Sequence, residues 1–550
     1  MYYPTLDEIK QLRHFDLAAD AAGAKNPQVG ARSLLVPLCC DVRADMETPV
    51  SVYCKTAQGP FSFLLESVAN GERIARYSFI GIDPYMVMTQ HGETAKLYKS
   101  SCERKSTDTR SSLGHPCSTP YTEEGSFIIE EVSCHDPLEL VEAEMSQYRL
   151  IKPAGIIDEL PHFHGGAVGY LAYESVARFE HLPIPSNDEL GLPLAIFCFT
   201  ETVLVFDHLK HRVRIVTHLH LDAPDLDAEY QRGLTIIDEV RKRLRQAPHV
   251  PEEPIPISDA AALKIVSNRT RCDFEAMVRQ AQEYIRAGDI FQVVLSQRLS
   301  RHVNAAPFTV YRALRTINPS PYLFYLDMHD FHIIGASPEL LVRVEGGDVT
   351  IHPIAGTRPR GTNRQSDREL ADELKNDAKE RAEHVMLVDL GRNDVGRVSQ
   401  PGSVRVSQFM DIERYSYVMH LVSNVTGRLR EDVTPCDALR AGFPAGTVTG
   451  APKIRAMEII SELEGEQRGV YAGAVGYFSH SGELDTAIAL RTMVMQNGRA
   501  YIQAGSGIVA DSNPGNEYQE SMNKARALLC ALEEAESIAK ERRHETLLAC

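Results

Sequence analysis

The sequence of 550 residues contains no tryptophan, no Cys-x-x-Cys pair and no apolar run long enough to cross a bilayer. Its eleven cysteines are scattered and odd in number, which is typical of reduced thiols rather than of a disulfide or zinc framework. The N-terminus has neither the apolar core of a signal peptide nor the Arg- and Ser-rich character of a transit peptide. These absences predict a soluble, cytoplasmic protein with no membrane partner.

Positive charge is also scarce, because 58 Lys and Arg residues face 75 Asp and Glu residues, for a formal net charge of −17. No basic stripe follows the chain, so a nucleic-acid partner is excluded. An anionic ligand would have to be attracted by a few local positive charges. The remaining composition, 43% hydrophobic and 24% charged, is that of a globular protein long enough for two domains.

Two segments interrupt the alternation of apolar and polar residues. One segment, at about 98–126, is rich in Ser and Thr and almost free of aliphatic side chains. It cannot bury enough apolar surface to offset its ordering entropy, which predicts an exposed insertion. The other is rich in proline and predicts a domain boundary. The expected divisions are an N-terminal region 1–246 with an insertion at about 98–126, a linker 247–262, a second domain 263–535 and a charged tail 536–550.

Beyond the linker, helical and strand patterns alternate without the regularity of βαβ units. Apolar residues recur at helical spacing from Phe274 to Ile285, and Gly288 marks the end of that helix. A strand is expected at 290–300, and a long helix at 366–388. This mixture favours an α+β fold. The sequence Gly-Ala-Val-Gly-Tyr occurs at 166–170 and again at 473–477, either by chance or as equivalent strands of two related halves.

Acidic side chains share a face on each of two expected helices. Glu380 and Glu383 are three residues apart, and Glu517, Glu520 and Lys524 follow the spacing i, i+3, i+7. Taken alone, such patterns are most often solvated helix faces or intrahelical ion pairs. A carboxylate from each of two helices, without nearby cysteine or clustered histidine, would suit a Mg²⁺ ion that keeps several waters.

The segment 444–453, PAGTVTGAPK, is a Gly- and Thr-rich turn that leads into a helix. Free amides and hydroxyls at a helix start can bind an anion, although an ordinary capped turn has the same composition. The spacing from Gly446 to Lys453 is not that of a phosphate-binding P-loop, so nucleotide binding is not supported.

Six segments together resemble the chorismate-binding enzyme family: 353–361 (PIAGTRPRG), 379–394, 414–423 (RYSYVMHLVS), 444–453, 489–494 (ALRTMV) and 504–529. They occur in the family's order. The resemblance implies large antiparallel sheets that form a sandwich-like core with helices packed outside. It also implies Mg²⁺-dependent conversion of chorismate.

Two positions separate the members of this family. The water-activating Lys of isochorismate and salicylate synthases is replaced by Gln292, and the nucleophilic Lys of common aminodeoxychorismate synthases by Ala355. The resemblance therefore implies direct attack by ammonia on chorismate, which gives anthranilate and pyruvate, the first committed step of tryptophan biosynthesis. An aminodeoxychorismate synthase component without the lysine and a catalytically inactive tryptophan-binding paralogue remain as alternatives.

The family's motifs assign roles to individual residues. Glu383 and Glu520 would hold Mg²⁺, with Glu380 and Glu517 ordering its waters, and Arg491 would bind the enolpyruvyl carboxylate as a bidentate fork. His420 is the candidate general acid or base, unless it is only a hydrogen-bonded core histidine. Lys524 is the candidate electrostatic support, unless it only pairs with Glu520. The other residues expected to bind substrate are Thr357, Thr447, Tyr471, Gly505 and Gly507, with Thr447 also counted as catalytic.

The N-terminal region resembles the segment that binds tryptophan as a feedback inhibitor in the anthranilate-forming members. The residues expected to form the inhibitor site are Glu66, Ser67, Asn318, Pro321, Tyr322, Leu323, Val475, Gly476 and Tyr477. The last three follow shortly after Tyr471, which suggests how the two sites could communicate. No glutaminase signature is present, so a separate glutamine amidotransferase subunit is the expected partner and source of ammonia.

Overall fold

The computed structural model describes residues 2–21, 32–67, 76–100, 127–153, 160–257, 261–414 and 418–549. Within these ranges, the strands form two large sheets of 14 and 12 strands. Neighbouring strands are antiparallel throughout, apart from the parallel pairing of β2 with β8. The α+β sandwich expected from the sequence is therefore confirmed.

The first sheet has a continuous path of strands and two additional short strands at its side. Its path is β1 (Tyr2–Tyr3), β2 (Ser33–Arg43), β12 (Arg212–His220), β11 (Val203–Asp207), β4 (Tyr77–Gly81), β3 (Phe63–Glu66), β15 (Tyr322–Asp327), β16 (Phe331–Ser337), β25 (Thr492–Gln496), β26 (Arg499–Ile508), β14 (Gln292–His302) and β13 (Val266–Ser267). The additional strands are β8 (Tyr148–Leu150) on β2 and β22 (Gly450–Ala451) on β14.

The second sheet packs against the first. Its path is β19 (Ile354–Pro359), β21 (Val418–Arg428), β18 (Asp348–Ile351), β17 (Leu340–Glu345), β24 (Leu484–Ile488), β23 (Ala474–Ser479), β9 (Gly166–Leu171), β10 (Ala195–Thr200), β5 (Met86–His91), β6 (Thr94–Ser100) and β7 (Phe127–Ser133), with β20 (Arg405–Arg414) paired to β21.

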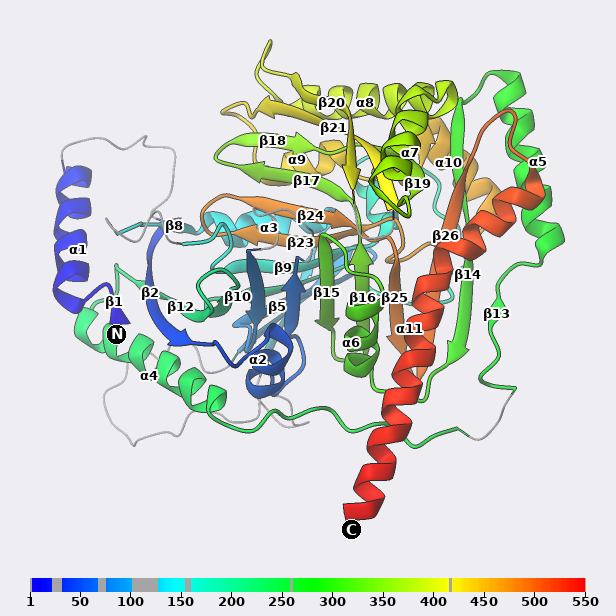
Figure 1. Cartoon of the computed structure of the whole chain (residues 1–550). Coiled ribbons are helices and arrows are strands. Elements are labelled where there is room, and N and C mark those ends of the chain that lie inside the picture. Colours follow the sequence, from blue (N-terminus) through cyan, green and yellow to red (C-terminus); the bar gives the residue numbers. More distant parts are fainter. Residues whose placement is uncertain are drawn as a thin grey trace.

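Both sheets combine strands from the two sides of the expected linker. β3 pairs with β15 in the first sheet, and β9 pairs with β23 in the second. After α4 (Leu226–Leu244), the chain crosses along the bottom of the view in Figure 1 to reach the right-hand half. The proline-rich segment thus joins two halves of the sequence that share their sheets, and the domain boundaries stay a prediction.

The repeated Gly-Ala-Val-Gly-Tyr segments are neighbours at the centre of the second sheet. They form β9 and β23, which run antiparallel with Gly169 opposite Gly476. A Cβ at Gly169 would lie 1.9 Å from the carbonyl oxygen of Ile196, and one at Gly476 would lie 2.1 Å from that of Asp485. The glycines therefore permit close approach of adjacent strands, and the origin of the repeat in two related halves stays a hypothesis.

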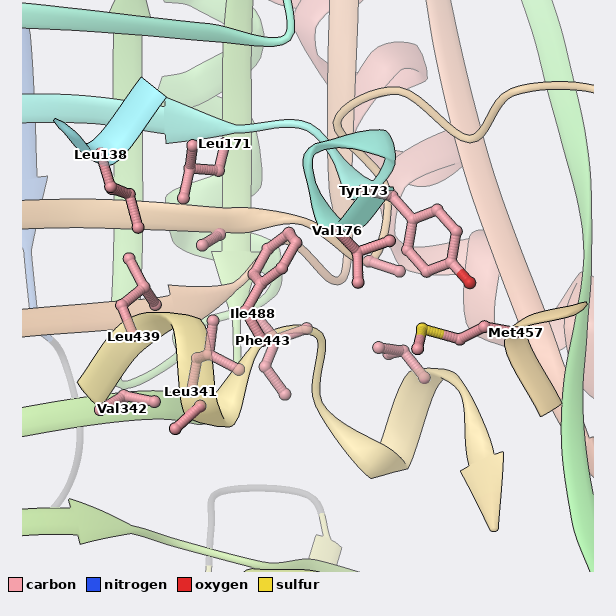
Figure 2. Packing of buried hydrophobic residues seen from close by; sticks show 14 of the residues in the cluster. Leu138, Leu171, Tyr173, Val176, Leu341, Val342, Leu439, Phe443, Met457 and Ile488 are labelled. Carbon is pink, nitrogen blue, oxygen red and sulfur yellow. The ribbon is translucent and has the colours of Figure 1, made fainter. Parts of the chain in front are cut away.

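Apolar side chains fill the space between the sheets and cover both outer faces. Val168, Ile196 and Cys198 of the second sheet pack with Phe324 and Ile333 of the first. On the outer face of the second sheet, Leu171 and Ile488 belong to one apolar cluster with Leu439 and Met457 from helices (Figure 2). Helices therefore enclose a sandwich core. None of the described helices is both long and apolar enough to cross a membrane.

Several of the helices begin or end at recognisable capping residues. Gly288 ends the helix over Arg271–Ala287 in a left-handed conformation, as the sequence predicts. The helices not yet given are α1 (Leu6–Ala21), α2 (Pro49–Thr56), α3 (Pro137–Ser146), α5 (Arg271–Ala287), α6 (Pro307–Ile317), α7 (Arg364–Asn376), α8 (Ala378–Val398), α9 (Pro435–Gly442), α10 (Lys453–Glu464) and α11 (Pro514–Ala549), with short 3₁₀ turns η1 (Tyr173–Arg178) and η2 (Gly446–Val448).

Three expectations about local structure need correction. The single helix expected at 366–388 is two helices, because Asp377 leaves the helical conformation and caps α8 through the backbone amides of Lys379 and Glu380. Residues 98–100 belong to strand β6, whereas the rest of the predicted insertion lies outside the described residues. The expected change to a tail at 536 falls inside α11.

Candidate active site

A cavity of about 570 Å³ opens between the ends of the two sheets and helices α8 and α11. Every residue that the sequence analysis assigned to metal, substrate or catalysis lines it. These residues are Thr357, Glu380, Glu383, His420, Thr447, Tyr471, Arg491, Gly505, Gly507, Glu517, Glu520 and Lys524. Gln292 and Ala355, the two positions that separate family members, also face the cavity.

Two pairs of carboxylates belong to the first two turns of α8 and α11. Burial raises the pKa of Glu380 against the opposing hydrogen bond from Arg358 at 3.3 Å, and the neighbouring negative charge of Glu383 adds to the rise. Burial likewise raises the pKa of Glu517, with a further contribution from Glu520. Concentrated negative charge of this kind is stabilised by a bound cation.

The carboxylates fit a magnesium ion better than a closed metal cage. Among the described residues, no group of three or more His, Cys, Asp or Glu side chains is arranged to enclose a metal. Glu383 Oε1 accepts a hydrogen bond from Gln292 Nε2 at 3.0 Å, and Glu520 Oε1 lies 2.8 Å from Lys524 Nζ. One oxygen ligand from each helix, completed by water and substrate oxygens, is the coordination that Mg²⁺ commonly adopts.

Tyr471 and Arg491 are carried by two loops that are tied together. The amide of Ala472 donates to the carbonyl of Ala489 at 3.1 Å, and the amide of Ala489 donates to that of Gly473 at 2.9 Å. Arg491 has a φ of +46°, and Ala472 has a φ of +64°. Left-handed backbone in residues other than glycine is costly and is often found at functional sites. The two loops therefore place a phenol and a guanidinium at the same cavity wall.

Strand β26 lies next to Tyr471 in the cavity wall. Lys524 Nζ donates to the carbonyl oxygen of Gly505 at 3.0 Å. A Cβ at Gly505 would lie 3.0 Å from the Tyr471 hydroxyl, and one at Gly507 would lie 2.5 Å from Gln292 Nε2. These glycines leave space and expose backbone at the cavity. The Thr447 hydroxyl is buried in the same cavity, beside the carboxyl of Glu339.

His420 lies beside Thr357 on adjacent strands. Its Nδ1 is 2.9 Å from the carbonyl oxygen of Gly356 and 3.1 Å from the Thr357 hydroxyl. A contact to a carbonyl assigns the proton to Nδ1. Burial lowers the pKa of His420, and the positive charge of Arg491 lowers it further. The imidazole is therefore neutral near pH 7 and suited to accept a proton rather than to donate one.

Glu339 is a cavity residue that the sequence analysis missed. The residue is 7% exposed, and burial raises its pKa to about 8, against the opposing hydrogen bond from Thr447 and the positive charges of Arg491 and Lys524. At neutral pH this carboxyl keeps its proton and can donate it. Its segment, Ser-Pro-Glu, carries no periodic or charge signal that would distinguish it from an exposed strand end.

The residues expected to bind tryptophan lie where the two sheets meet. Glu66 pairs with Leu323 across adjacent strands, and the Tyr322 hydroxyl donates to Asp485 at 3.1 Å. Asp485 in turn lies opposite Tyr477. Asn318 and Pro321 immediately precede β15, and Val475 and Gly476 belong to β23, so both sheets contribute to the set.

Two of these residues carry unused buried polar atoms. Neither Ser67 Oγ nor Asn318 Nδ2 has a hydrogen-bond partner among the described residues. The carboxylate of Glu66 already has two protein partners, because Arg315 Nε lies 2.7 Å away and Tyr311 donates to it at 2.5 Å. A carboxylate can accept further hydrogen bonds, so this pairing leaves room for an ammonium group.

Comparison with known proteins identifies the class. The model of the chorismate binding enzyme family matches residues 103–530. The chain is 44% identical over 541 residues to an anthranilate synthase component 1 of Acetivibrio thermocellus, covering 98% of this chain and 100% of that relative. It is 46% identical to the anthranilate synthase component 1 of Pseudomonas putida, covering 91% of this chain and 96% of that relative. The chain belongs to the chorismate-binding enzyme family.

A solved structure at a comparable sequence identity belongs to the same kind of protein as these two relatives. The crystal structure of anthranilate synthase component I from Streptococcus pneumoniae superposes with a TM-score of 0.66 at 40% identity, covering 82% of this chain and 92% of that one. Its sequence relatives and this solved structure carry the same description, which does not favour either alternative activity.

Proposed function

We propose that the chain is the large subunit of an anthranilate synthase, which converts chorismate and ammonia to anthranilate, pyruvate and water. The observation that carries the proposal is the cavity itself. It combines facing carboxylates, Arg491 and Tyr471, and its wall presents glutamine and alanine where lysine would direct the other reactions. Ammonia therefore meets neither a water-activating amine nor a competing lysine nucleophile.

Chorismate is a dianion, and the cavity offers separate partners for its two carboxylates. The guanidinium of Arg491 and the hydroxyl of Tyr471 are suited to the enolpyruvyl carboxylate. Mg²⁺ held by Glu383 and Glu520 would supply the charge that neutralises the ring carboxylate. The Thr447 hydroxyl and the backbone at Gly505 and Gly507 can satisfy remaining carboxylate oxygens. The locally gathered cations explain how a strongly acidic protein binds an anionic substrate.

Bond changes in the first step are addition of ammonia at C2 and loss of the C4 hydroxyl. Hydroxide is a poor leaving group, so it must depart as water after receiving a proton. Glu339 holds a proton at neutral pH, whereas burial keeps His420 neutral. We assign the donor role to Glu339. In the second step, His420 can accept the C2 proton as the C3–O bond of the enolpyruvyl ether breaks and the ring becomes aromatic. The departing methylene carbon takes up one proton, which gives pyruvate and restores the neutral imidazole when His420 returns it.

The proposed function is tested by mixing the purified chain with chorismate, Mg²⁺ and an ammonium salt. Anthranilate fluorescence should appear, and addition of a chelator should abolish it. Glutamine should replace ammonium only when a glutamine amidotransferase subunit is added, because the chain carries no glutaminase signature. A 4-aminobenzoate-type product, or no amino-aromatic product from the folded chain, would contradict the proposal.

Tryptophan is the proposed feedback inhibitor, bound between β3, β15 and β23. The Ser67 hydroxyl and Asn318 amide, which have no hydrogen-bond partner within the described part of the chain, support this site, because buried polar atoms are normally hydrogen-bonded. β23 begins three residues after Tyr471, so a ligand that prefers a displaced β23 would misplace the substrate-binding phenol.

Replacing Ser67 by leucine should raise the tryptophan concentration for half inhibition by about tenfold or more, because the larger side chain fills the site and removes a hydrogen bond. Ser67→Ala should give a smaller increase. Ser62→Ala is the matched control, since Ser62 is buried at the start of the same strand and its hydroxyl contacts Tyr53 at 2.7 Å. Inhibition unchanged in Ser67→Leu would place the regulatory site elsewhere.

A cytoplasmic location is part of the proposal. The eight cysteines in the described residues are all free, and seven of them are at least partly buried. Unpaired thiols are typical of a reducing compartment.

A further inference from the structure

Arg468 has the largest fully buried side chain in the described structure, with 1% of its surface exposed, yet the proposed chemistry does not use it. It lies in the connection between α10 and β23, three residues before Tyr471. A buried guanidinium must be paired and hydrogen-bonded, because removing it from water is costly. Its contacts show which parts of the molecule it holds.

The guanidinium donates to two backbone carbonyls in the wall of the active-site cavity. Nη1 donates to Val448 at 2.8 Å, and Nη2 donates to Val294 at 2.7 Å. Both valines line the cavity, and Val448 directly follows Thr447. Arg468 thus joins the Thr447 turn to strand β14 from behind the cavity.

Two tyrosine rings flank the same group. The carbon atom at the centre of the guanidinium lies 5.5 Å from the ring centre of Tyr471 and 4.9 Å from that of Tyr173. A cation over an aromatic ring is attracted to it and fixes its orientation. Because the positive charge withdraws electron density from the ring, it also makes the Tyr471 hydroxyl a better hydrogen-bond donor.

Further contacts hold Arg468 in place. Its Nε and Nη2 form a bidentate pair with Glu464 at 2.8 and 2.6 Å, and Glu464 accepts from the amide and hydroxyl of Ser296 at 2.8 and 2.9 Å. The backbone amide of Arg468 donates to Glu174 at 2.6 Å, and that of Gly469 donates to the same carboxylate at 3.0 Å. Glu174 comes from η1 in the N-terminal half of the sequence.

Buried ion pairs contribute little net stability compared with apolar packing, so a well-ordered one is better explained by what it positions. We propose that Arg468 is a positioning residue for substrate binding, which fixes the Tyr471 ring and the Thr447–Val448 turn so that both hydroxyls face the substrate. This inference rests on the proposed function and extends it to a residue outside the cavity. Only a planar guanidinium with five donors can reach all of these groups at once.

The variant Arg468→Lys tests the inference, because lysine keeps the charge but cannot form the fork or bridge the two carbonyls. With ammonium as the nitrogen source, the KM for chorismate should rise about tenfold or more, whereas kcat should change by less than about threefold. A loss of substrate positioning predicts this separation of KM from kcat.

Arg214→Lys is the matched control. Arg214 is 3% exposed, forms a bidentate pair with Asp41 at 2.8 and 3.1 Å, and lies 5.3 Å from the ring centre of Tyr3, far from the cavity in the sheet order. Its substitution should lower the unfolding temperature without raising the KM. If Arg468→Lys does not fold, Glu464→Asp, which draws the guanidinium back by one methylene, should show the same KM increase.

A double-mutant cycle with Tyr471→Phe completes the test. If Arg468 acts through the phenol, the two substitutions should increase the KM by less together than the product of their separate effects. A KM for Arg468→Lys no higher than that of Arg214→Lys, or effects that multiply fully in the cycle, would overturn the inference. Absence of anthranilate formation by the unmodified chain would instead overturn the proposed function.

Discussion

Glu520→Gln is expected to reduce anthranilate formation by about a hundredfold or more at ordinary Mg²⁺ concentrations, because a neutral amide is a poor ligand for a hard cation. Part of the activity should return at high Mg²⁺, which would show a weakened metal site rather than an unfolded protein. The measurement is a Mg²⁺ titration of ammonia-dependent turnover, with unfolding temperatures recorded in parallel.

The opposing interpretation is that Glu520 serves only as the helical partner of Lys524. Such a pair contributes a few tenths of a kcal/mol, and its loss would leave turnover intact. Glu275→Gln is the control, since Glu275 lies 2.8 Å from Arg271 four residues earlier on α5, away from the cavity. If Glu520→Gln has no more effect on turnover than Glu275→Gln, the metal assignment is wrong.

The residues of the candidate site could be predicted from the sequence because they sit in ordered motifs. Helical spacing placed Glu380 with Glu383, and Glu517 with Glu520, on single faces, and the structure directs both faces into one cavity. Spacing alone could not bring the two helices together. That step came from the family resemblance, which supplied the long-range arrangement.

Glu339 shows where sequence reasoning ends. A glutamate after proline at a strand start is most often exposed, and no neighbouring residue in the sequence marks it as different. Its burial arises from segments far along the chain, including Thr447 and Arg491, which enclose it in the folded protein. A shifted pKa is a property of that assembled environment and has no local signature.

The fold was predictable as a class but not in its connections. Alternation and turn residues indicated strands, yet the pairing of β3 with β15 and of β9 with β23 joins segments hundreds of residues apart. The interruption at Asp377 was also missed, because residues 366–388 contain neither proline nor glycine and only the capping geometry reveals the break. That break sets the start of α8, and therefore the position of Glu380 and Glu383.

Glu339→Gln is expected to lower kcat by about a hundredfold or more, because the amide cannot supply the proton that turns the C4 hydroxyl into water. The KM for chorismate should change far less, since glutamine has nearly the same shape. Asp327→Asn is the control, because burial also raises the pKa of Asp327, which lies in β15 and does not line the cavity. Turnover equal to that of the unmodified chain would leave His420 or water as the donor.

The pH dependence separates a proton donor from a structural residue. Glu339 of the ligand-free protein loses its proton as pH rises through about 8, so kcat/KM should fall in that range in the unmodified chain and the residual activity of Glu339→Gln should lack this limb. The unfolding free energy should also fall as the pH rises. Between the ordinary glutamate value of 4.5 and about 8, the folded state retains a proton that the unfolded state has lost, so the unfolding free energy decreases as pH rises. Glutamine has no proton to lose, so the unfolding free energy of Glu339→Gln should lack this decrease. The variant should therefore be more stable than the unmodified chain at pH 9, although it is less active.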